Sequence, residues 1–367
     1  MKETWVIKIG SSLITKSSTG LNIKNIKSWA SQINELVNSN INVIIVSSGA
    51  IAEGMNRLGL VKRPTSASKL QALAAIGQMG LAQVYEVAFK KYNILTAQML
   101  LTHDDLSSRA RYLNAKNTLN NLIKYKTIPV INENDTVSTE EIKFGDNDTL
   151  AALVANLSEA SSLVILTDQD GLYTSDPSID KSSELVNSIS ISDKKLLQYA
   201  GPSNNNLGRG GMITKISAAK IAAKSNTKTI ILNGTKANIL LKLFNKEKNI
   251  GTIIYNKNTA VKSKKQWIAN SLKIKGSLII DAGAGNVIKK SGKSLLPVGI
   301  KSISGNFHKG DMVTICDSDN IEIAKGLVNY DARLLEKIIG KSTLEIKNEF
   351  TVFDSEEAIH RDNMILS

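Results

Sequence analysis

The sequence contains 367 residues, of which 42% are hydrophobic and 22% charged, and its formal net charge is +13. The length predicts about two domains, and the composition is that of a globular protein, which excludes disordered and fibrous classes. The single cysteine, Cys316, excludes an internal disulfide and indicates a reducing compartment. The positive charge is spread along the chain without a dense basic run, so it argues only weakly for a nucleic-acid partner and suits anionic ligands.

The N-terminal apolar run, residues 6–9, is too short for a signal peptide. The longest uncharged stretch, residues 70–85, carries three glutamines and falls short of the ~20 apolar residues that a membrane span needs. We therefore expect a cytoplasmic protein without a membrane partner.

Short β-branched runs alternate with longer helical patterns along the first two thirds of the chain. The predicted strands are residues 6–9, 43–46, 128–131, 163–166 and 229–232. The predicted helices are residues 25–38, 68–89, 107–124, 148–156 and 213–223. This alternation predicts an α/β fold in three layers, with helices on both faces of a mostly parallel central sheet. Ligands of such sheets bind at loops that leave the carboxyl ends of the strands.

The pattern changes near residue 257. A polar, basic connector at residues 258–272 predicts a linker, and short strand-like segments with glycine turns follow it. We predict a first domain at residues 1–257, a small mostly β domain at residues 273–351 and a C-terminal tail at residues 352–367.

The first two predicted strands end in glycine and serine. Gly10 allows close approach of the backbone to a ligand, and Lys8, one step earlier, can place its ammonium group on a transferring phosphate. Ser48 and Gly49 follow the second strand, where the start of a helix attracts anions. The alternatives are a strand-end lysine that points into water and a simple N-cap serine.

Two clusters of Asn and Asp come next in the chain. Asn132 and Asp135 follow the third strand, and Asn147 and Asp148 follow residue 145 at the start of a helix. Such groups are costly to bury without partners, so we interpret them as a binding site for an ammonium group and polar ligand atoms. The alternative is ordinary turn and cap chemistry, above all for Asp148.

The fourth strand is followed by Thr167 and Asp168, and a glycine-rich turn at residues 208–211 leads into a helix with Lys215 in its first turn. This arrangement resembles a phosphate clamp, although a bare glycine-rich loop is a weak signal. Lys293 and Lys341 sit in Gly-Lys-Ser tripeptides, but neither has the glycine that a Walker A loop requires five residues before its Gly-Lys pair. With one cysteine and three separated histidines, a Cys/His zinc site or a histidine-based triad is disfavoured.

Taken in order, these loops resemble the amino acid kinase family, most closely its members that phosphorylate glutamate. The resemblance covers essentially the whole chain, and its most specific segments are residues 45–51, 98–102, 130–135 and 145–148. The domain predicted at residues 273–351, together with residues 360–363 of the tail, resembles a PUA domain, a β fold of the RNA-binding type. Aspartokinases are expected to carry ACT modules instead, and acetylglutamate and uridylate kinases normally lack this appendage, which favours glutamate as the acceptor.

The resemblance implies phosphorylation of the side-chain carboxylate of L-glutamate by ATP with Mg²⁺, the entry step of proline biosynthesis. It implies two catalytic lysines, Lys8 and Lys215. The implied substrate-binding residues are Ser48, Gly49, Asn132, Asp135, Asn147 and Asp148. The implied nucleotide-binding residues are Lys8, Gly10, Thr167, Asp168, Arg209, Gly210, Gly211, Met212, Ile213, Thr214 and Lys215. The family usually has threonine where this chain has Arg209, and no side chain is assigned to Mg²⁺.

The resemblance also implies a homo-oligomer, a dimer or tetramer, and proline as a feedback inhibitor. Three alternatives stay open. The chain could act on another acceptor, such as aspartate or N-acetylglutamate. It could be an RNA-binding protein that acts through the PUA-like domain, or a proline-responsive sensor with weak catalysis.

Overall fold

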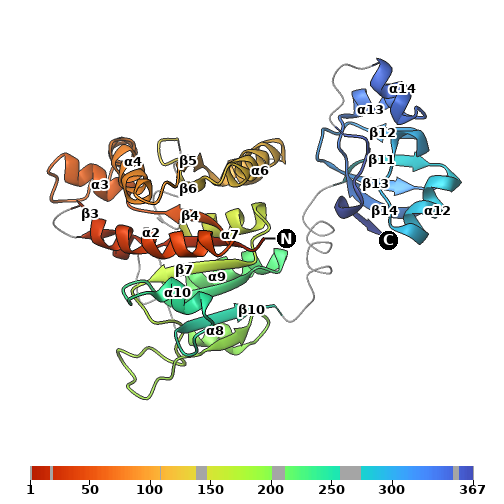
Figure 1. Ribbon diagram of the computed structural model, residues 1–367. Coiled ribbons are helices and arrows are strands. Elements are labelled where there is room, and N and C mark those ends of the chain that lie inside the picture. Colours follow the sequence, from red (N-terminus) through yellow and green to blue (C-terminus); the bar gives the residue numbers. More distant parts are fainter. Residues whose placement is uncertain are drawn as a thin grey trace. The chain divides into compact units, whose positions relative to one another are not determined.

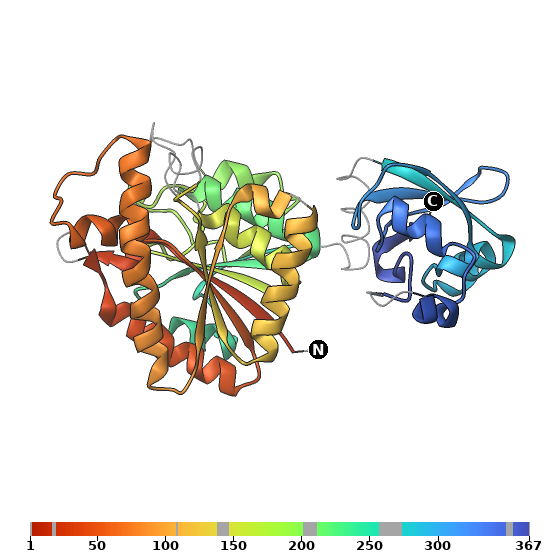
Figure 2. The ribbon, with the colours of Figure 1, turned by 90° about the horizontal axis from the view of Figure 1, so that it is seen from above.

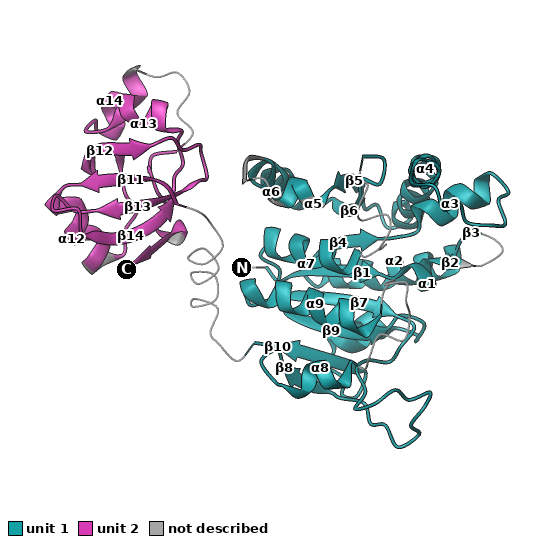
Figure 3. Ribbon diagram, turned by 180° about the vertical axis from the view of Figure 1, so that it is seen from behind, with its two compact units in different colours: residues 1–259 teal, residues 260–367 magenta. Residues whose placement is uncertain are grey.

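The computed structural model describes residues 2–16, 20–107, 109–137, 147–200, 211–256, 274–349 and 355–366. The chain divides into two compact units, residues 1–259 and residues 260–367 (Figure 3). The predicted linker, residues 258–272, lies outside the described residues, so the predicted domain bounds stay a prediction. Each unit is described by itself below.

Unit 1 is built on a sheet of eight strands. Their order is β5 (Thr96–Leu101), β6 (Ile128–Glu133), β4 (Asn42–Ser47), β1 (Thr4–Ile9), β7 (Ser162–Thr167), β9 (Lys228–Asn233), β10 (Gly251–Tyr255) and β8 (Ser188–Ser190). Every pairing is parallel except that of β9 with β10. The central strands are apolar at nearly every position because both faces of the sheet are covered.

Helices cover both faces, as Figure 2 shows. On one face α2 (Ile23–Asn38), α4 (Ala67–Lys90) and α10 (Ile239–Phe244) pack on Trp5, Ile7 and Ile9 of β1. On the other face α6 (Arg109–Lys124), α7 (Asn147–Leu157) and α9 (Met212–Ala222) pack on a core that includes Val6. Alternate side chains of β1 thus enter two different cores, and the predicted three-layer α/β/α fold is confirmed (Figure 1).

Shorter elements complete unit 1. They are α1 (Ser11–Ile14), β2 (Thr15–Lys16), β3 (Gly20–Leu21), α3 (Ala50–Arg57), α5 (His103–Ser107), α8 (Lys195–Tyr199) and a 3₁₀ turn at Ala223–Ser225. The sequence had not indicated β5, β8 or β10, which lie at or near the two ends of the sheet. The five predicted strands and five predicted helices are present, and no bound is shifted by more than two residues.

α4 is long and apolar enough, by length and composition alone, to cross a membrane. Half of the relevant stretch is buried inside unit 1, as in the core helix of a globular fold. The exposed face of α4 nevertheless carries Ile76, Met79 and Val87, which are 36%, 70% and 57% exposed.

α3 and α4 cross in very close contact at two glycines. A Cβ atom on Gly77 would lie 1.8 Å from the carbonyl oxygen of Ala50, and one on Gly54 would lie 1.9 Å from that of Leu73. Both obstacles are backbone atoms, so a side chain at either position forces the helices apart.

We expect Gly77→Ala to destabilise unit 1 by at least ~1–3 kcal/mol, because overpacking of a closed contact forces backbone shifts. This corresponds to a fall in Tm of roughly 3–10 °C. Thermal unfolding followed by fluorescence of the buried Trp5 and Trp29 measures it. The matched control is Gly80→Ala on the same helix, where the new Cβ meets only the movable ends of Arg57 and Glu53. Equal Tm values for the two variants would contradict the prediction.

Unit 2 contains a five-stranded sheet in the order β12 (Ile300–Gly305), β11 (Ile274–Ile280), β13 (Met312–Cys316), β14 (Glu322–Leu327) and β15 (Met364–Leu366). Within its described residues, three helices accompany the sheet: α12 (Ala282–Ser291), α13 (Ala332–Ile338) and α14 (Thr343–Glu349). Short 3₁₀ turns lie at Pro297–Gly299 and Arg361–Asn363. A core of its own, which includes Leu278, Phe307 and Ile315, holds the unit together.

Candidate active site

The parallel strands β6, β4, β1 and β7 bring their carboxyl ends to one edge of the sheet. A cavity of about 310 Å³ opens there. It is lined by Lys8, Gly10, Ser11, Ser12, Ser48, Gly49, Ala50, Ile51, Ala52, Arg63, Asn132, Glu133, Asp135, Asn147, Leu166, Thr167, Asp168 and Lys215. Loops from distant parts of the chain therefore line the same cavity, as expected for loops that leave the carboxyl ends of parallel strands.

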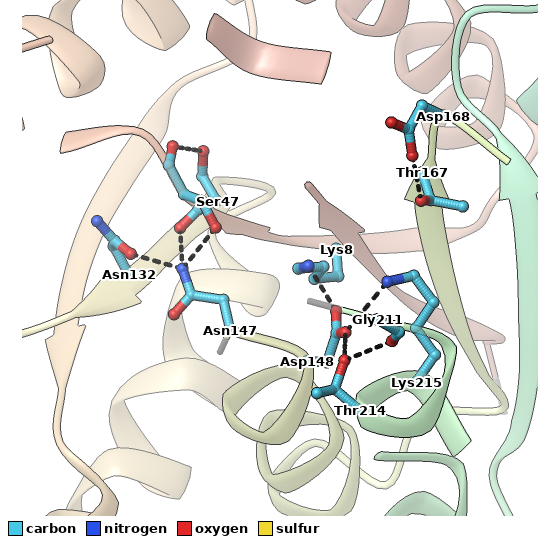
Figure 4. A network of polar contacts seen from close by, with 11 residues as sticks. Lys8, Ser47, Asn132, Asn147, Asp148, Thr167, Asp168, Gly211, Thr214 and Lys215 are labelled. Atoms are coloured by element: carbon cyan, nitrogen blue, oxygen red, sulfur yellow. Dashed lines mark hydrogen bonds and ion pairs between the residues drawn. The ribbon is translucent and has the colours of Figure 1, made fainter. Parts of the chain in front are cut away.

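Two lysines in the wall of this cavity share one carboxylate, that of Asp148, which is fully buried and does not line the cavity (Figure 4). Lys8 Nζ lies 2.5 Å from Asp148 Oδ1, and Lys215 Nζ lies 3.5 Å from Asp148 Oδ2. The three residues are 6%, 0% and 4% exposed in the order Lys8, Asp148, Lys215. One anion thus holds two cations side by side in a buried place.

Three secondary-structure elements position these groups. Lys8 lies in β1 between β4 and β7, in register with Val46 and Ile165. Asp148 lies in the first turn of α7 and Lys215 in the first turn of α9. The two helices pack side by side against the same core, which brings their N-terminal turns together.

Asp148 is held as an anion by its surroundings. Burial raises its pKa, but the ammonium groups of Lys8 and Lys215 and the hydroxyl of Thr214 outweigh that effect, so the pKa of Asp148 lies below its ordinary value. The Thr214 hydroxyl is 2.8 Å from Asp148 Oδ2 and 2.8 Å from the carbonyl oxygen of Gly211. The glycine-rich end of α9 is thereby tied to the lysine pair.

A second group of polar side chains lies beside the lysines. Asn147 Nδ2 donates to the carbonyl oxygen of Ser47 at 2.7 Å, to Ser48 Oγ at 2.9 Å and to Asn132 Oδ1 at 2.9 Å (Figure 4). Asn132 Nδ2 in turn donates to Gln78 Oε1 at 2.8 Å. The loop ends of β4 and β6 and the start of α7 are joined by this hydrogen-bonded network.

A larger cavity of about 560 Å³ adjoins the first at Asp168, which lines both. Residues 168–177 and 198–200 contribute most of its wall, together with Met212. Thr167 Oγ1 donates to Asp168 Oδ1 at 3.0 Å at the junction. Two ligands, one in each cavity, would meet beside Asp168.

The remaining predicted residues that the structure describes lie around the same edge. Gly49 adopts φ +106° as the residue before α3, a left-handed conformation that favours glycine. The Gly10 amide donates to the carbonyl oxygen of Leu166 at 3.2 Å. Gly211, Met212 and Ile213 form the start of α9, and Ile213 is 38% exposed. Arg209 and Gly210 lie outside the described residues, so their predicted nucleotide contacts stay a prediction.

Sequence reasoning left out five polar residues in or near the cavity, and three of them, Ser11, Ser12 and Glu133, lie in its wall. Arg63, between α3 and α4, lines it directly. Gln78 does not line it, but is buried behind it and bonds to Asn132. The one signal for Gln78 was a polar residue among the buried positions of α4, such as Ala74, Leu81 and Tyr85.

Within the described parts of the chain, no three Asp, Glu, His or Cys side chains gather as ligands of a resident metal ion. The carboxylate of Asp168, which lines both cavities at their junction, could hold a hydrated cation brought by a ligand.

Comparison with known proteins gives consistent matches. Residues 3–233 match the amino acid kinase family, and residues 276–350 match the PUA domain. The chain is 49% identical over 363 residues to the glutamate 5-kinase of Hydrogenovibrio crunogenus and 48% identical over 362 residues to that of Methylococcus capsulatus. Each match covers 99% of this chain and 96% of the relative. A crystal structure of UMP kinase from Ureaplasma parvum is similar with a TM-score of 0.48 and 19% identity, over 70% of this chain and 100% of its own.

Proposed function

The chain belongs to the amino acid kinase family, among its glutamate 5-kinases, and from this membership we propose that the cavity around Lys8 and Lys215 is where phosphoryl transfer takes place. The activity is the ATP-dependent phosphorylation of the side-chain carboxylate of L-glutamate to L-glutamyl 5-phosphate, the first step of proline biosynthesis. The observation that carries the site assignment is the pair of ammonium groups on one buried carboxylate, beside the amide network.

Phosphorylation of a carboxylate depends on stabilising negative charge more than on transferring a proton. A side-chain carboxylate has a pKa near ~4.3 and is ionised at neutral pH, so no general base is required. One carboxylate oxygen bonds to the γ-phosphorus, the bond from that phosphorus to the β,γ-bridging oxygen breaks, and ADP leaves with the electron pair. The barrier is the approach of an anion to a polyanion, and Lys8 and Lys215 lower it by stabilising the charge that develops.

The two cavities suggest how the substrates divide the space. The smaller one, with Ser48, Asn132, Asp135 and Asn147, suits the amino acid, and Asp135 supplies a carboxylate for its ammonium group. The larger one suits the nucleotide, whose phosphates would extend past Asp168 toward Lys215. Mg²⁺ bound to those phosphates would neutralise part of their charge.

Asp148 has a further role in this proposal. Its carboxylate lies between the two lysines at 2.5 and 3.5 Å, so it orients the ammonium groups that face the phosphates. The sequence also predicted that Asp148 contacts the substrate, and that contact stays a prediction.

We expect glutamate to be the preferred acceptor in a panel with aspartate and N-acetylglutamate. Trapping the acyl phosphate with hydroxylamine measures each product directly, with and without ATP. The expected result is ATP-dependent hydroxamate from glutamate at a kcat/KM at least ~100-fold above the other two, since shortening or blocking the substrate misplaces its reacting carboxylate. A preference for either rival acceptor would overturn the assignment of glutamate to the cavity.

Several finer points are proposals as well. The exposed apolar face of α4 with Ile76, Met79 and Val87 supports a homo-oligomer, a dimer or tetramer. The one cysteine supports a cytoplasmic location. Feedback inhibition by proline and binding of RNA by unit 2 follow from the family and the PUA match alone.

A further inference from the structure

The amides of Gln78, Asn132 and Asn147 form a continuous row behind and along the amino acid end of the cavity, and this set is called the amide row. All three are buried, at 8%, 2% and 6% exposure. Asn132 and Asn147 line the cavity, whereas Gln78 lies one layer deeper on α4. Buried amides of this kind keep a single orientation only when donors face acceptors at each contact.

The carbonyl oxygen of Ser47 sets the order of donors and acceptors at one end of the row, and the acceptor oxygen of Gln78 holds it at the other end. The carbonyl oxygen of Ser47 can only accept, so Asn147 must turn its NH₂ group toward it. That NH₂ group also faces Asn132, which must therefore offer its amide oxygen. The NH₂ group of Asn132 is then left for Gln78, whose oxygen accepts it at 2.8 Å.

This order determines which hydrogen-bonding groups of the amide row are available to a ligand. The NH₂ groups of Asn132 and Asn147 are taken up by protein acceptors. Among the described residues, the amide oxygen of Asn147 receives no protein hydrogen bond, and it remains an acceptor. Together with the carboxylate of Asp135 in the same cavity, the row presents acceptors, which suit a cationic ammonium group and not an anion.

We propose that Gln78 is a positioning residue that selects for the α-ammonium group of the amino acid substrate by holding the amide row in this order. The inference rests on the proposed function, because it concerns the same cavity and substrate. Without an acceptor at position 78, the NH₂ group of Asn132 loses its partner and is free to turn toward the ligand. The row then no longer favours a cation over a neutral methylene group.

The test compares glutamate with glutarate, which has the same two carboxylates and lacks the ammonium group. The variants are Gln78→Met, which keeps the length of the side chain without a strong acceptor, and Gln78→Glu, which keeps the acceptor oxygen. The measured quantity is the Ki of glutarate as a competitive inhibitor divided by the KM of glutamate. This ratio does not depend on the fraction of enzyme that is folded.

In Gln78→Met we expect the ratio to fall at least 10-fold, through a higher KM for glutamate, while kcat and the KM for ATP stay within about 3-fold of wild type. Gln78→Glu should restore most of the ratio. An unchanged ratio in Gln78→Met, or equal losses in both variants, would overturn the inference while the proposed function stands. A wild-type enzyme that does not phosphorylate glutamate would instead overturn the proposed function and this inference with it.

Discussion

Replacing Lys8 with methionine is expected to lower kcat by roughly 10³-fold, because one preorganised cation in a buried site contributes about 10²–10³ to the rate and Lys8 also holds Asp148. Methionine keeps the length of the buried side chain and removes only its charge. Initial rates with saturating glutamate and ATP measure the effect. The KM values should change far less than kcat, since the ammonium group acts mainly on the charge that develops during transfer.

The same substitution removes one of the two cations that compensate the buried negative charge of Asp148, so the free energy of unfolding is expected to fall as well. Removing one partner of a buried ion pair costs about 3–5 kcal/mol when nothing else compensates. Here Lys215 and Thr214 still contact the carboxylate, at 3.5 and 2.8 Å, so a smaller loss is expected.

A double variant separates folding from catalysis. Lys8→Met combined with Asp148→Asn removes both charges of the pair, so it should recover most of the lost Tm without recovering kcat. If the double variant regained activity, the low rate of Lys8→Met would be a folding defect, and the catalytic role of Lys8 would be wrong.

Replacing Asp148 alone with asparagine is expected to lower kcat by at least ~100-fold, because the two ammonium groups then repel each other and lose their fixed positions. It should also change how stability depends on pH. The pKa of Asp148 is lowered in the folded protein, so the unfolded state binds more protons between the folded pKa and the unfolded value near ~3.9. Stability from this group is therefore present above the unfolded pKa and is lost as the pH falls through the folded pKa.

The stability difference between wild type and Asp148→Asn should thus be greatest near neutral pH and should shrink below about pH 4. Urea unfolding at pH 7, 5 and 3.5, followed by tryptophan fluorescence, measures it. The control is Glu159→Gln, which removes the exposed pair of Glu159 with Lys116 at 2.8 Å. This control should change stability by about 1 kcal/mol or less. A pH-independent difference for Asp148→Asn would show that its carboxylate is not held as an anion by the lysines.

The fold could be predicted from the sequence where burial left a strong pattern. The central strands β1, β4, β6, β7 and β9 are covered on both faces, so their apolar runs are nearly continuous. β5 was missed because it lies at the edge of the sheet, where Gln98 is exposed and β-branched residues are few. β8 and β10 were missed because they are short, and the pairing of β10 with β9 is the one antiparallel pairing of the eight-stranded sheet.

The sequence could predict only those site residues that lie at or directly after the carboxyl end of a strand, where ligands of parallel sheets bind. Lys8, Ser48, Asn132 and Thr167 each follow a strand or lie at its carboxyl end, so the order of strands and loops was enough to assign them to one edge of the sheet. The ion pair of Lys8 with Asp148 joins residues 140 positions apart and depends on how α7 packs on the sheet. Gln78 reaches the amide row from α4, and its partner Asn132 is 54 residues away. Local patterns carry no information on such pairings.

The glycine crossing of α3 and α4 has a consequence for the amino acid end of the cavity. Gly77, which lets α4 touch the backbone of Ala50, directly precedes Gln78 in the chain, and Ala50 directly follows Gly49 in the cavity wall. α4 cannot slide or turn against α3 without shifting that wall and the acceptor for Asn132 at the same time. We therefore expect a change at the exposed apolar face of α4 to shift the cavity wall at Gly49 and Ala50 as well.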